Sequence, residues 1–463
     1  MRRALVLFTC DLRVRDHAAL AAAVAEREQV VPAFVLDERL LAGSCGASNR
    51  LAFLRDCLRD LDASLRARGA GLVVRHGDVV EQALALARRF KADAIYMSAD
   101  TTPYARERHA RLARACGEQR IELIALGSPS AVEPGAVVPA GGGPYRVFTP
   151  YWRAWHAVAP GGARTPRRIP APPGLPAMRL PALASVRAAA SEQPRGGETA
   201  GRERLARFFS RHLAGYGERH DDLAGDATSR LSPYLHFGCL SARAVLERAD
   251  GRDGSEAFAR QLCWRDFHRQ VLADRPEVPR ADYRPRTRAW RRDPEALDAW
   301  REGRTGIPIV DAGMRQLTRE GWMHNRARLI VASLLTKTLR IDWRPGAAHF
   351  AVQLCDADVA DNVGNWQWVA GTGNDTRPNR VLNPLRQARR FDPAGDYVRR
   401  YVPELDALDG AAIHEPWRLG SVERRRLRYP QPIVDPAMFG RLPGAARAPA
   451  GPRTPGAGRP PGP

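Results

Sequence analysis

Ala4-Leu5-Val6-Leu7-Phe8-Thr9 opens the chain with a short apolar run, the first of five runs that share this character. The four later runs are equally short and rich in apolar or β-branched residues: Val30–Leu36, Gly71–Arg75, Ala94–Ser98 and Ile121–Leu126. Stretches rich in alanine and arginine separate them: Ala18–Arg27, Asn49–Arg68, Val79–Arg89 and Ala105–Cys116. Apolar strands joined by helical crossovers are typical of a parallel sheet with helices on both faces. We therefore predict an α/β domain with a doubly wound parallel sheet over residues 1–130.

The rest of the chain divides by composition into three parts. Residues 131–200 are rich in Pro, Gly and Ala and are predicted to form a connector that crosses the surface. Residues 201–436 place apolar residues at three- and four-residue spacing and contain few β-rich runs, which predicts an all-α domain. Residues 437–463 are mostly Gly, Pro, Ala and Arg, a composition that predicts a disordered tail.

The charge balance is strongly positive. The 463 residues include 72 Lys and Arg against 51 Asp and Glu, which gives a formal net charge of +21. Only Lys91 and Lys337 are lysines, so the excess is carried by arginine. A field of this sign favours a polyanionic partner such as nucleic acid, although charge alone supports a merely solubilising surface about equally well.

Cysteine usage and apolar run lengths exclude several classes of protein. The 7 cysteines form no C-x-x-C pair and none stands at zinc spacing from a histidine, so we expect free thiols, a reducing cytoplasm and no metal. Charges at Asp11, Arg13 and Arg15 end the first apolar run too early for a signal peptide. The run Leu329–Leu335 is far shorter than the ~20 residues that span a bilayer.

Polar and aromatic residues that packing alone does not require gather in three stretches of the helical half, Gln261–Phe267, Gly321–Arg328 and Asp356–Trp368. On a helix, Asn325 and Arg328 share a face that suits a planar heterocycle with polar edges. The alternative, about equally favoured by spacing, is a structural ion pair of Arg328 with Asp356 or Asp358.

A fourth stretch, Thr228-Ser229-Arg230-Leu231-Ser232-Pro233, sets hydroxyls around an arginine ahead of a helical segment. Such donors can hold a phosphate, although this pattern is more often a helix N-cap.

Together these stretches resemble the photolyase/cryptochrome flavoprotein family, most closely its class I cyclobutane pyrimidine dimer photolyases. The matching motifs run in the family's order along nearly the whole chain: Asp11-Leu12-Arg13, Val147–Tyr151, Thr228–Ser232, Trp264–Phe267, Ala299–Gly306, Pro308–Arg315, Gly321–Arg326, Asn362–Trp368 and Asn383-Pro384. The resemblance implies an α/β antenna domain and a helical domain that binds FAD non-covalently.

The resemblance also assigns residues to the cofactor. Those that match the surroundings of the FAD phosphates are Tyr216, Thr228, Ser229, Arg230, Leu231 and Ser232, with Phe258 where the family usually has a tryptophan near the cofactor. Those that match contacts to the flavin ring are Arg265, Asn325, Arg328, Asp356 and Asp358. Asn362 matches an asparagine near flavin N5, where an amide helps to hold the reduced flavin.

Further matches concern electron transfer and DNA. Trp300, Trp343 and Trp366 match a chain of tryptophans that leads from the surface to the flavin. The pocket for the DNA lesion would be lined by Gln261, Trp264, Asn325, Leu329 and Trp368, with Arg326 and Arg380 facing phosphates. At the DNA and lesion contacts the chain departs from the family at three positions: Gln261 replaces a glutamate, Leu329 a methionine and His220 an arginine.

The implied activity is light-driven splitting of cyclobutane pyrimidine dimers in UV-damaged DNA by electron transfer from reduced FAD, in a monomer that needs no protein partner. Two alternatives stay open: a cryptochrome-type blue-light photoreceptor, and an electron-transfer flavoprotein that binds DNA without repair. Enzymes that repair (6-4) photoproducts are disfavoured because they have histidines where Asn325 and Leu329 stand. Iron–sulfur members are disfavoured because the helical half holds only three cysteines, Cys239, Cys263 and Cys355.

Members of the family add an antenna chromophore, either methenyltetrahydrofolate or 8-hydroxy-5-deazaflavin. The folate-binding branch has an Asn-Glu contact just after the tyrosine that Tyr104 matches, whereas here Ala105 and Arg106 follow and Glu107 is displaced. A shift of one position turns a side chain by about 100° around a helix. We therefore expect a deazaflavin antenna.

Overall fold

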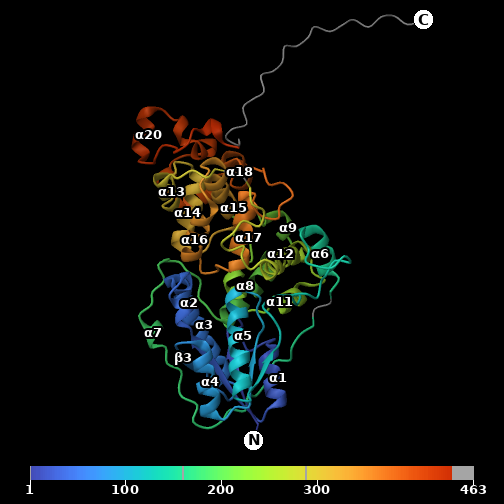
Figure 1. Ribbon diagram of the computed structural model, residues 1–463. Coiled ribbons are helices and arrows are strands. Elements are labelled where there is room, and N and C mark those ends of the chain that lie inside the picture. The colour runs from blue at the N-terminus through green and yellow to red at the C-terminus, as the bar shows by residue number, and fades with distance from the viewer. Residues whose placement is uncertain (1, 159–160, 287–288, 441–463) are drawn as a thin grey trace, which may run out of the picture.

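A computed structural model describes residues 2–158, 161–286 and 289–440, with an α/β lobe at the N-terminal end and a helical lobe beside it (Figure 1). The α/β lobe is built on a five-stranded parallel sheet of order β3-β2-β1-β4-β5. Its strands are β1 (Arg3–Phe8), β2 (Gln29–Leu36), β3 (Val73–His76), β4 (Ala94–Met97) and β5 (Glu122–Ala125). The chain winds outward from β1 in both directions, which confirms the predicted doubly wound sheet.

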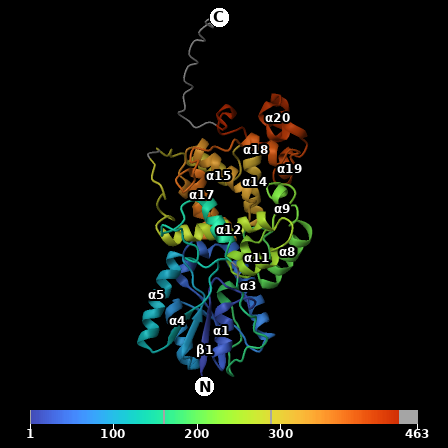
Figure 2. The same ribbon diagram turned by 90° about the vertical axis from the view of Figure 1, so that its right-hand side faces the viewer.

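Helices cover both faces of the sheet, as Figure 2 shows. In β1, Val6 belongs to the apolar cluster under α1 (Ala18–Glu26) and α3 (Ser48–Arg66), whereas Leu7 belongs to the cluster under α4 (Val79–Phe90) and α5 (Pro103–Glu118). Successive side chains of a strand point to opposite faces, so a strand buried on both faces must be apolar throughout. The short helices α2 (Glu38–Leu41) and η1 (Ser44–Gly46) precede α3.

The connector runs along the outside of the α/β lobe past α7 (Pro181–Ala184) but is not confined to the surface (Figure 1). Its helix α6 (Phe148–His156) buries Trp155, which is 1% exposed. Asp266 of α12 (Ser255–Asp274) anchors the connector, because its Oδ2 accepts hydrogen bonds from Trp155 Nε1 at 2.9 Å and from the backbone N of Ala131 at 2.9 Å. The connector, predicted to lie on the surface, is therefore partly buried where α6 packs against the helical half.

The described residues after β5 contain helices and loops but no strand, in agreement with the predicted all-α half. Besides α12, its helices are α8 (Glu198–Arg211), α9 (Tyr216–Arg219), α10 (Ser232–His236), α11 (Ala242–Ala249), α13 (Pro294–Arg301), α14 (Pro308–Glu320), α15 (Asn325–Ser333), α16 (Trp343–Gln353), α17 (Val359–Ala370), α18 (Pro384–Phe391), α19 (Asp396–Tyr401) and α20 (Ser421–Leu427). Five short helices complete it: η2 (Leu334–Thr338), η3 (Pro403–Leu405), η4 (Gly410–His414), η5 (Pro416–Arg418) and η6 (Pro436–Met438).

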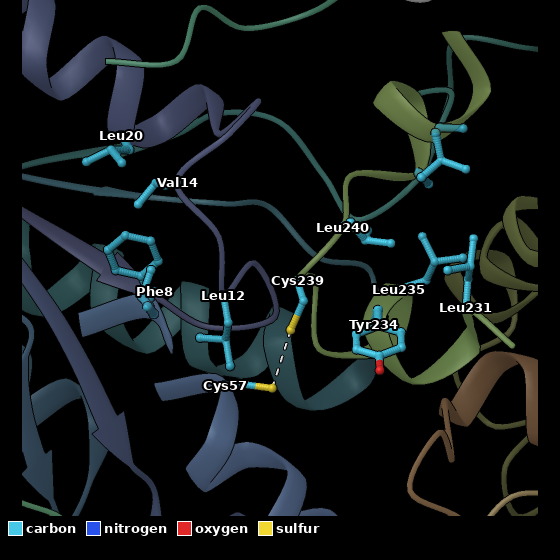
Figure 3. Packing of buried hydrophobic residues seen from close by; sticks show 14 of the residues in the cluster. Phe8, Leu12, Val14, Leu20, Cys57, Leu231, Tyr234, Leu235, Cys239 and Leu240 are labelled. Atoms are coloured by element: carbon cyan, nitrogen blue, oxygen red, sulfur yellow. Dashed lines mark hydrogen bonds between the residues drawn. The ribbon is translucent and has the colours of Figure 1, made fainter. Parts of the chain in front are cut away.

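One apolar cluster joins the two halves, and Figure 3 shows part of it. Leu12 follows β1, and its backbone N donates to the carbonyl of Phe237 at 3.1 Å. Cys57 of α3 and Cys239, beyond α10, are both buried with their sulfur atoms 3.3 Å apart (Figure 3). All seven cysteines are free thiols, as the sequence predicts.

Packed structure continues past residue 436, because Phe439 is 6% exposed and its ring lies 6.1 Å from that of Trp417. Residues 441–463, which make up most of the predicted disordered tail, lie outside the described residues. Within the described ranges, no helix combines the length and the apolar character needed to cross a membrane.

Candidate functional site

Three hollows in the helical half meet at Asn325 and Asp361, which line all of them. The inner hollow reaches from Tyr216 to Asp358. The rear hollow extends from Arg328 to Trp366. The outer hollow opens past Trp264 and Trp368.

The inner hollow collects the residues predicted to surround the cofactor. From α9, the loop before α10, α12 and α15 come Tyr216, Thr228, Ser229, Arg230, Leu231, Ser232, Phe258, Arg265 and Asn325, and Asp356 and Asp358 complete the set. Arg328 does not line the inner hollow but lines the rear and outer hollows that adjoin it. The structure thus brings together segments that lie more than 100 residues apart in sequence.

The loop before α10 is not a side-chain N-cap, because the N-cap residue Leu231 makes no capping hydrogen bond through its side chain. Thr228 Oγ1 is buried and has no hydrogen-bond partner within the described chain. Arg230 adopts a left-handed φ of 51°, and its guanidinium lies 4.3 Å from the ring centre of Trp322 and 2.7 Å from Glu320. That guanidinium is already neutralised by Glu320 and Asp226, so we expect Arg230 to contribute its backbone to a phosphate site.

The ion pair considered from spacing is present between Arg328 and Asp356 at 2.8 Å. The Asp356 side chain is fully buried, and its second oxygen, Oδ1, has no hydrogen-bond partner among the described residues. A buried polar atom without a partner is costly, so this oxygen is ready to accept from a ligand donor. Together with Thr228 Oγ1 it shows that the hollow fits a ligand with a donor-bearing ring and a polar chain, as FAD has.

Asn325 begins α15, whose N-cap is His324, with the Nδ1 atom accepting from the backbone N of Arg326 at 3.1 Å. Burial lowers the pKa of His324 to about 4, so the ring is neutral and can accept at physiological pH. The cap fixes the first turn of α15 and with it the direction of the Asn325 side chain into the hollows.

Asp358 and Arg265 line the inner hollow, but their polar atoms are engaged with protein. Asp358 caps α17 and pairs with Arg269 at 2.5 Å, and although burial alone would raise the pKa of Asp358, the Arg269 charge holds it well below its usual range. Arg265 donates to the carbonyls of Pro129 and Leu235 at 2.5 and 3.0 Å. These two residues form part of the wall of the hollow. The Asp358 carboxylate and the Arg265 guanidinium are held in place by protein contacts before any ligand binds.

Asn362 lines the rear hollow, where the flavin edge is expected. Its Nδ2 donates to the carbonyl of Ala347 at 3.0 Å, which orients the amide. The carbonyl oxygen Oδ1 is left as an acceptor, the group that can hold an N–H at that edge.

The three tryptophans of the predicted electron route lie in one apolar cluster, but Trp300 is not at the surface. Trp366 lines the rear hollow, and its ring centre is 5.9 Å from that of Trp300. Trp300 is 0% exposed, Trp343 is 1% exposed and Trp366 is 2% exposed, so none of the three reaches the surface. Trp290, which the sequence reading missed, is partly exposed and packs against the same cluster. Exposure depends on the packing of distant helices, and no motif in the sequence reveals it.

Two indoles border the outer hollow together with Gln261 and Leu329, as predicted. The Trp264 ring stacks on Phe148 with centres 3.6 Å apart and an angle of 2° between the planes, which leaves its other face toward the hollow. The Arg380 guanidinium lies 5.0 Å from the Trp368 ring centre and has no carboxylate partner within the described residues.

Arg326 differs from Arg380, because its guanidinium forms two hydrogen bonds to Asp221, at 3.1 and 2.5 Å. A phosphate at Arg326 would therefore meet a charge that is already balanced by Asp221.

Two further titratable residues line the outer hollow and were not singled out from the sequence: His268 of α12 and Asp361 of α17. The His268 Nδ1 and Asp361 Oδ1 atoms are 2.9 Å apart. Asp361 lies in the polar and aromatic stretch Asp356–Trp368, but its partner His268 is 93 positions away in the sequence. Spacing alone therefore could not pair the two residues. No group of three or more metal-ligating side chains occurs in the described parts of the chain.

A separate polar site lies at the carboxyl ends of the strands, where Asp100, Thr101, Ser130 and Arg269 line a small hollow. Thr101 Oγ1 is buried there without a hydrogen-bond partner in the described chain. Glu107 points elsewhere: it pairs with Arg39 at 3.0 Å, and its side chain is 55% exposed.

Residues 4–173 match the family model described as DNA photolyase, and residues 258–440 match the model described as the FAD binding domain of DNA photolyase. A deoxyribodipyrimidine photo-lyase of Streptomyces griseus is 50% identical over 440 residues, which cover 94% of this chain and 97% of that protein. A cryptochrome DASH of Natronomonas pharaonis is 36% identical, covering 94% of this chain and 98% of that protein.

Solved structures agree with these matches. A bacterial class III photolyase from Agrobacterium tumefaciens superposes with a TM-score of 0.89 at 34% identity, covering 94% of this chain and 95% of that chain. An archaeal photolyase from Sulfolobus tokodaii, solved with two FAD molecules, superposes with a TM-score of 0.82 at 31% identity, covering 94% and 97%. Since both halves match in sequence and in fold over nearly their whole length, the chain belongs to the DNA photolyase family.

Proposed function

We propose that this protein splits cyclobutane pyrimidine dimers in UV-damaged DNA, using light and reduced FAD as the electron source. The observation that carries the proposal is the meeting, at Asn325, of the inner hollow that collects the expected cofactor residues with an outer hollow lined by two indoles. A base pair flipped out of DNA needs apolar faces to stack on, and Trp264 and Trp368 line the outer hollow. The relatives named deoxyribodipyrimidine photo-lyase support this activity.

The inner and rear hollows would hold FAD, which supplies the excited electron donor when bound. Thr228 Oγ1 and the backbone of the loop 228–232 would bind its phosphates, and Asp356 Oδ1 would accept from the ring. Arg328, which is paired with Asp356, would lie beside the ring, and the Asn362 carbonyl would accept from the ring edge. The Asn362 contact favours the reduced cofactor over the oxidised one.

In the outer hollow, the residues would bind and orient the dimer. Trp264 is held rigid by its stack on Phe148, so it can present its free face without first being ordered. Gln261 would donate an amide N–H to a pyrimidine carbonyl, and Leu329 would pack against the dimer. Arg380, which lacks a carboxylate partner among the described residues, would bind a backbone phosphate.

The tryptophans would reduce oxidised FAD and take no part in repair. We assign the solvent end of the route to Trp290, because an electron donor in solution needs a partly exposed ring and Trp300 is fully buried. We expect Trp366→Phe and Trp290→Phe to block photoreduction of oxidised FAD more strongly than Trp300→Phe. Once FAD is reduced chemically, all three variants should repair dimers like the unmodified protein; loss of repair in them would contradict this role.

For the second chromophore we propose 8-hydroxy-5-deazaflavin over methenyltetrahydrofolate, because Glu107 is exposed and paired with Arg39. A second FAD, as in the archaeal relative, is the alternative. Soaking the purified protein with each chromophore and following energy transfer to FAD decides between them, and tight binding of the folate would contradict our assignment.

The proposed function is tested by purifying the protein in the dark, recording its visible spectrum and incubating it with UV-irradiated oligo-dT under blue light. We expect one FAD per chain and loss of dimers that requires both light and reduced flavin. Flavin photoreduction without loss of dimers would favour a photoreceptor, the alternative that the similarity to a cryptochrome supports. A protein that takes up no flavin would contradict both roles.

A further inference from the structure

His268 and Asp361 form a pair that the motifs did not identify, across the contact between α12 and α17. The His268 Nδ1–H donates to Asp361 Oδ1 at 2.9 Å. His268 is 6% exposed, whereas the Asp361 side chain keeps 34% of its surface exposed. Asp361 lines all three hollows and His268 lines the outer one. The pair therefore lies between the hollows proposed for FAD and the hollow proposed for the DNA lesion.

The backbone of α17 makes room for the imidazole at Gly364. A Cβ atom at this position would lie 2.6 Å from His268 Cδ2 and 2.9 Å from Cγ, closer than real Cβ contacts. The ring is also bounded by Trp264, whose ring centre is 5.7 Å away. His268 is thus held in one place by α17 on one side and an indole of the outer hollow on the other.

The other charged groups of the outer hollow are already engaged. Arg326 binds Asp221, and Arg328 binds Asp356 and the carbonyl of Met323. Arg265 donates to two backbone carbonyls. By contrast, His268 Nε2 has no hydrogen-bond partner among the described residues. The atom is not fully buried, so a ligand in the outer hollow can reach it.

Gln261 cannot act as a cationic donor. It lies seven positions before His268, two turns earlier on the same face of α12, and it ends in a neutral amide. A neutral donor stabilises a developing negative charge less than a cationic donor does. A carboxylate facing a site of developing negative charge would be unfavourable by itself, whereas the Asp361–imidazolium pair has no net charge.

We propose that protonated His268, positioned by Asp361, donates its Nε2–H to a carbonyl oxygen of the bound pyrimidine dimer and so promotes bond splitting. This inference rests on the proposed function. When the dimer has accepted one electron, the negative charge on its carbonyl oxygen is stabilised by that proton, which Nε2 and the oxygen share. When the electron leaves after both ring bonds have broken, the proton is again held by Nε2, so that neither protons nor electrons are consumed.

The test uses full-length protein with its FAD reduced chemically, and measures dimers repaired per absorbed photon in UV-irradiated oligo-dT from pH 6 to 9. The variants are His268→Gln and Asp361→Asn, and the control is His109→Gln, the same change on α5 away from the hollows. Flavin content, the unfolding midpoint and affinity for the oligonucleotide are measured for each, so that a folding or binding defect is seen separately.

We expect the unmodified protein to repair more dimers per absorbed photon than His268→Gln, because only the unmodified protein has the imidazole donor beside the dimer. His268→Gln should be about tenfold lower at pH 6 and should not change with pH, the loss expected for one hydrogen bond to a developing charge. Asp361→Asn should also repair fewer dimers per photon, because an amide supports an imidazolium less well than a carboxylate does. His109→Gln should match the unmodified protein.

Other charged groups face the same space and must be included in reading the pH profile: Arg265, Arg269 and Asp358 around α12 and α17, His220 and Asp221 after α9, and Arg326 and Arg328 of α15. Their contribution persists in His268→Gln, so the difference between the two profiles belongs to His268. The pair is only structural if flavin-loaded His268→Gln repairs as many dimers per photon as the unmodified protein at every pH. If His268→Gln does not fold, the same comparison is made with Asp361→Asn. If the unmodified protein repairs nothing, the proposed function itself fails.

Discussion

Gly346 of α16 sets the position of the tryptophan that borders the rear hollow, and we predict that Gly346→Ala disturbs both stability and flavin binding. A Cβ atom at residue 346 would lie 2.3 Å from Trp366 Cη2 and 2.7 Å from Leu335 Cδ2, where ordinary contacts begin at 3.4 Å. The indole must therefore retreat by about 1 Å. Trp366 is 2% exposed and packed against Trp300 and Phe350, so the open space beside it is the rear hollow.

Two opposing terms give the expected magnitude. Overpacking a core by a methyl group costs about 1–3 kcal/mol. Replacing a helical glycine by alanine stabilises by roughly 0.5–1 kcal/mol. We therefore expect Gly346→Ala to destabilise the protein by about 1–2 kcal/mol and to lower its FAD content, because the displaced indole enters the cofactor space.

The assay compares urea unfolding midpoints and the ratio of flavin to protein absorbance. The matched control is Gly117→Ala in α5, where a new Cβ atom meets nothing within 4 Å, so this variant should be slightly more stable and keep its FAD. In a Trp366→Phe background, which removes the clashing ring atoms, Gly346→Ala should lower the midpoint by less than it does in the unmodified protein. Equal stability and equal FAD content in Gly346→Ala and Gly117→Ala would refute the reasoning.

Three further predictions concern pH, salt and capping. Burial raises the pKa of Asp392 from 3.8 to about 6, so the folded protein keeps a proton that the unfolded chain releases, and this residue's contribution to stability falls as the pH rises from 4 to 7. Asp392→Asn should remove up to about 3 kcal/mol of that pH dependence in urea unfolding, and an unchanged slope would contradict it. Arg380→Gln should reduce the salt dependence of binding to UV-irradiated oligo-dT by about 0.7 in log–log slope, whereas Arg114→Gln on α5 should not; equal slopes would exclude a phosphate contact. His324→Ala should cost about 1 kcal/mol through the lost cap of α15, seen as a lower unfolding midpoint, and an unchanged midpoint would show that the cap contributes nothing.

The α/β half could be predicted closely from local patterns. The apolar runs beginning at Ala4 and Val30 became β1 and β2, because a strand buried on both faces leaves a continuous apolar signature. The stretch Val79–Arg89 became α4 for the same kind of reason, since its apolar positions fall on one helix face. The order of the strands in the sheet was not encoded in any single run, although the doubly wound class was.

In the candidate site, the sequence identified residue types and their neighbours on a helix, and the fold brought most of them to one cavity. It could not show which charges are already balanced. Arg230 and Arg326 are satisfied by Glu320 and Asp221, which lie 90 and 105 positions away. Spacing along a helix does not report contacts between helices that meet only in the folded core.

By itself the sequence determined the parallel sheet, the all-α second half and the ordered series of family motifs, because these depend on local periodicity and on residue identity. Only the tertiary structure decided that Trp300 is buried while Trp290 reaches the surface, that α6 wedges against α12, and that His268 faces Asp361. The physical reason is that burial and pairing depend on how helices distant in sequence cross and pack, and that packing is a property of the whole core.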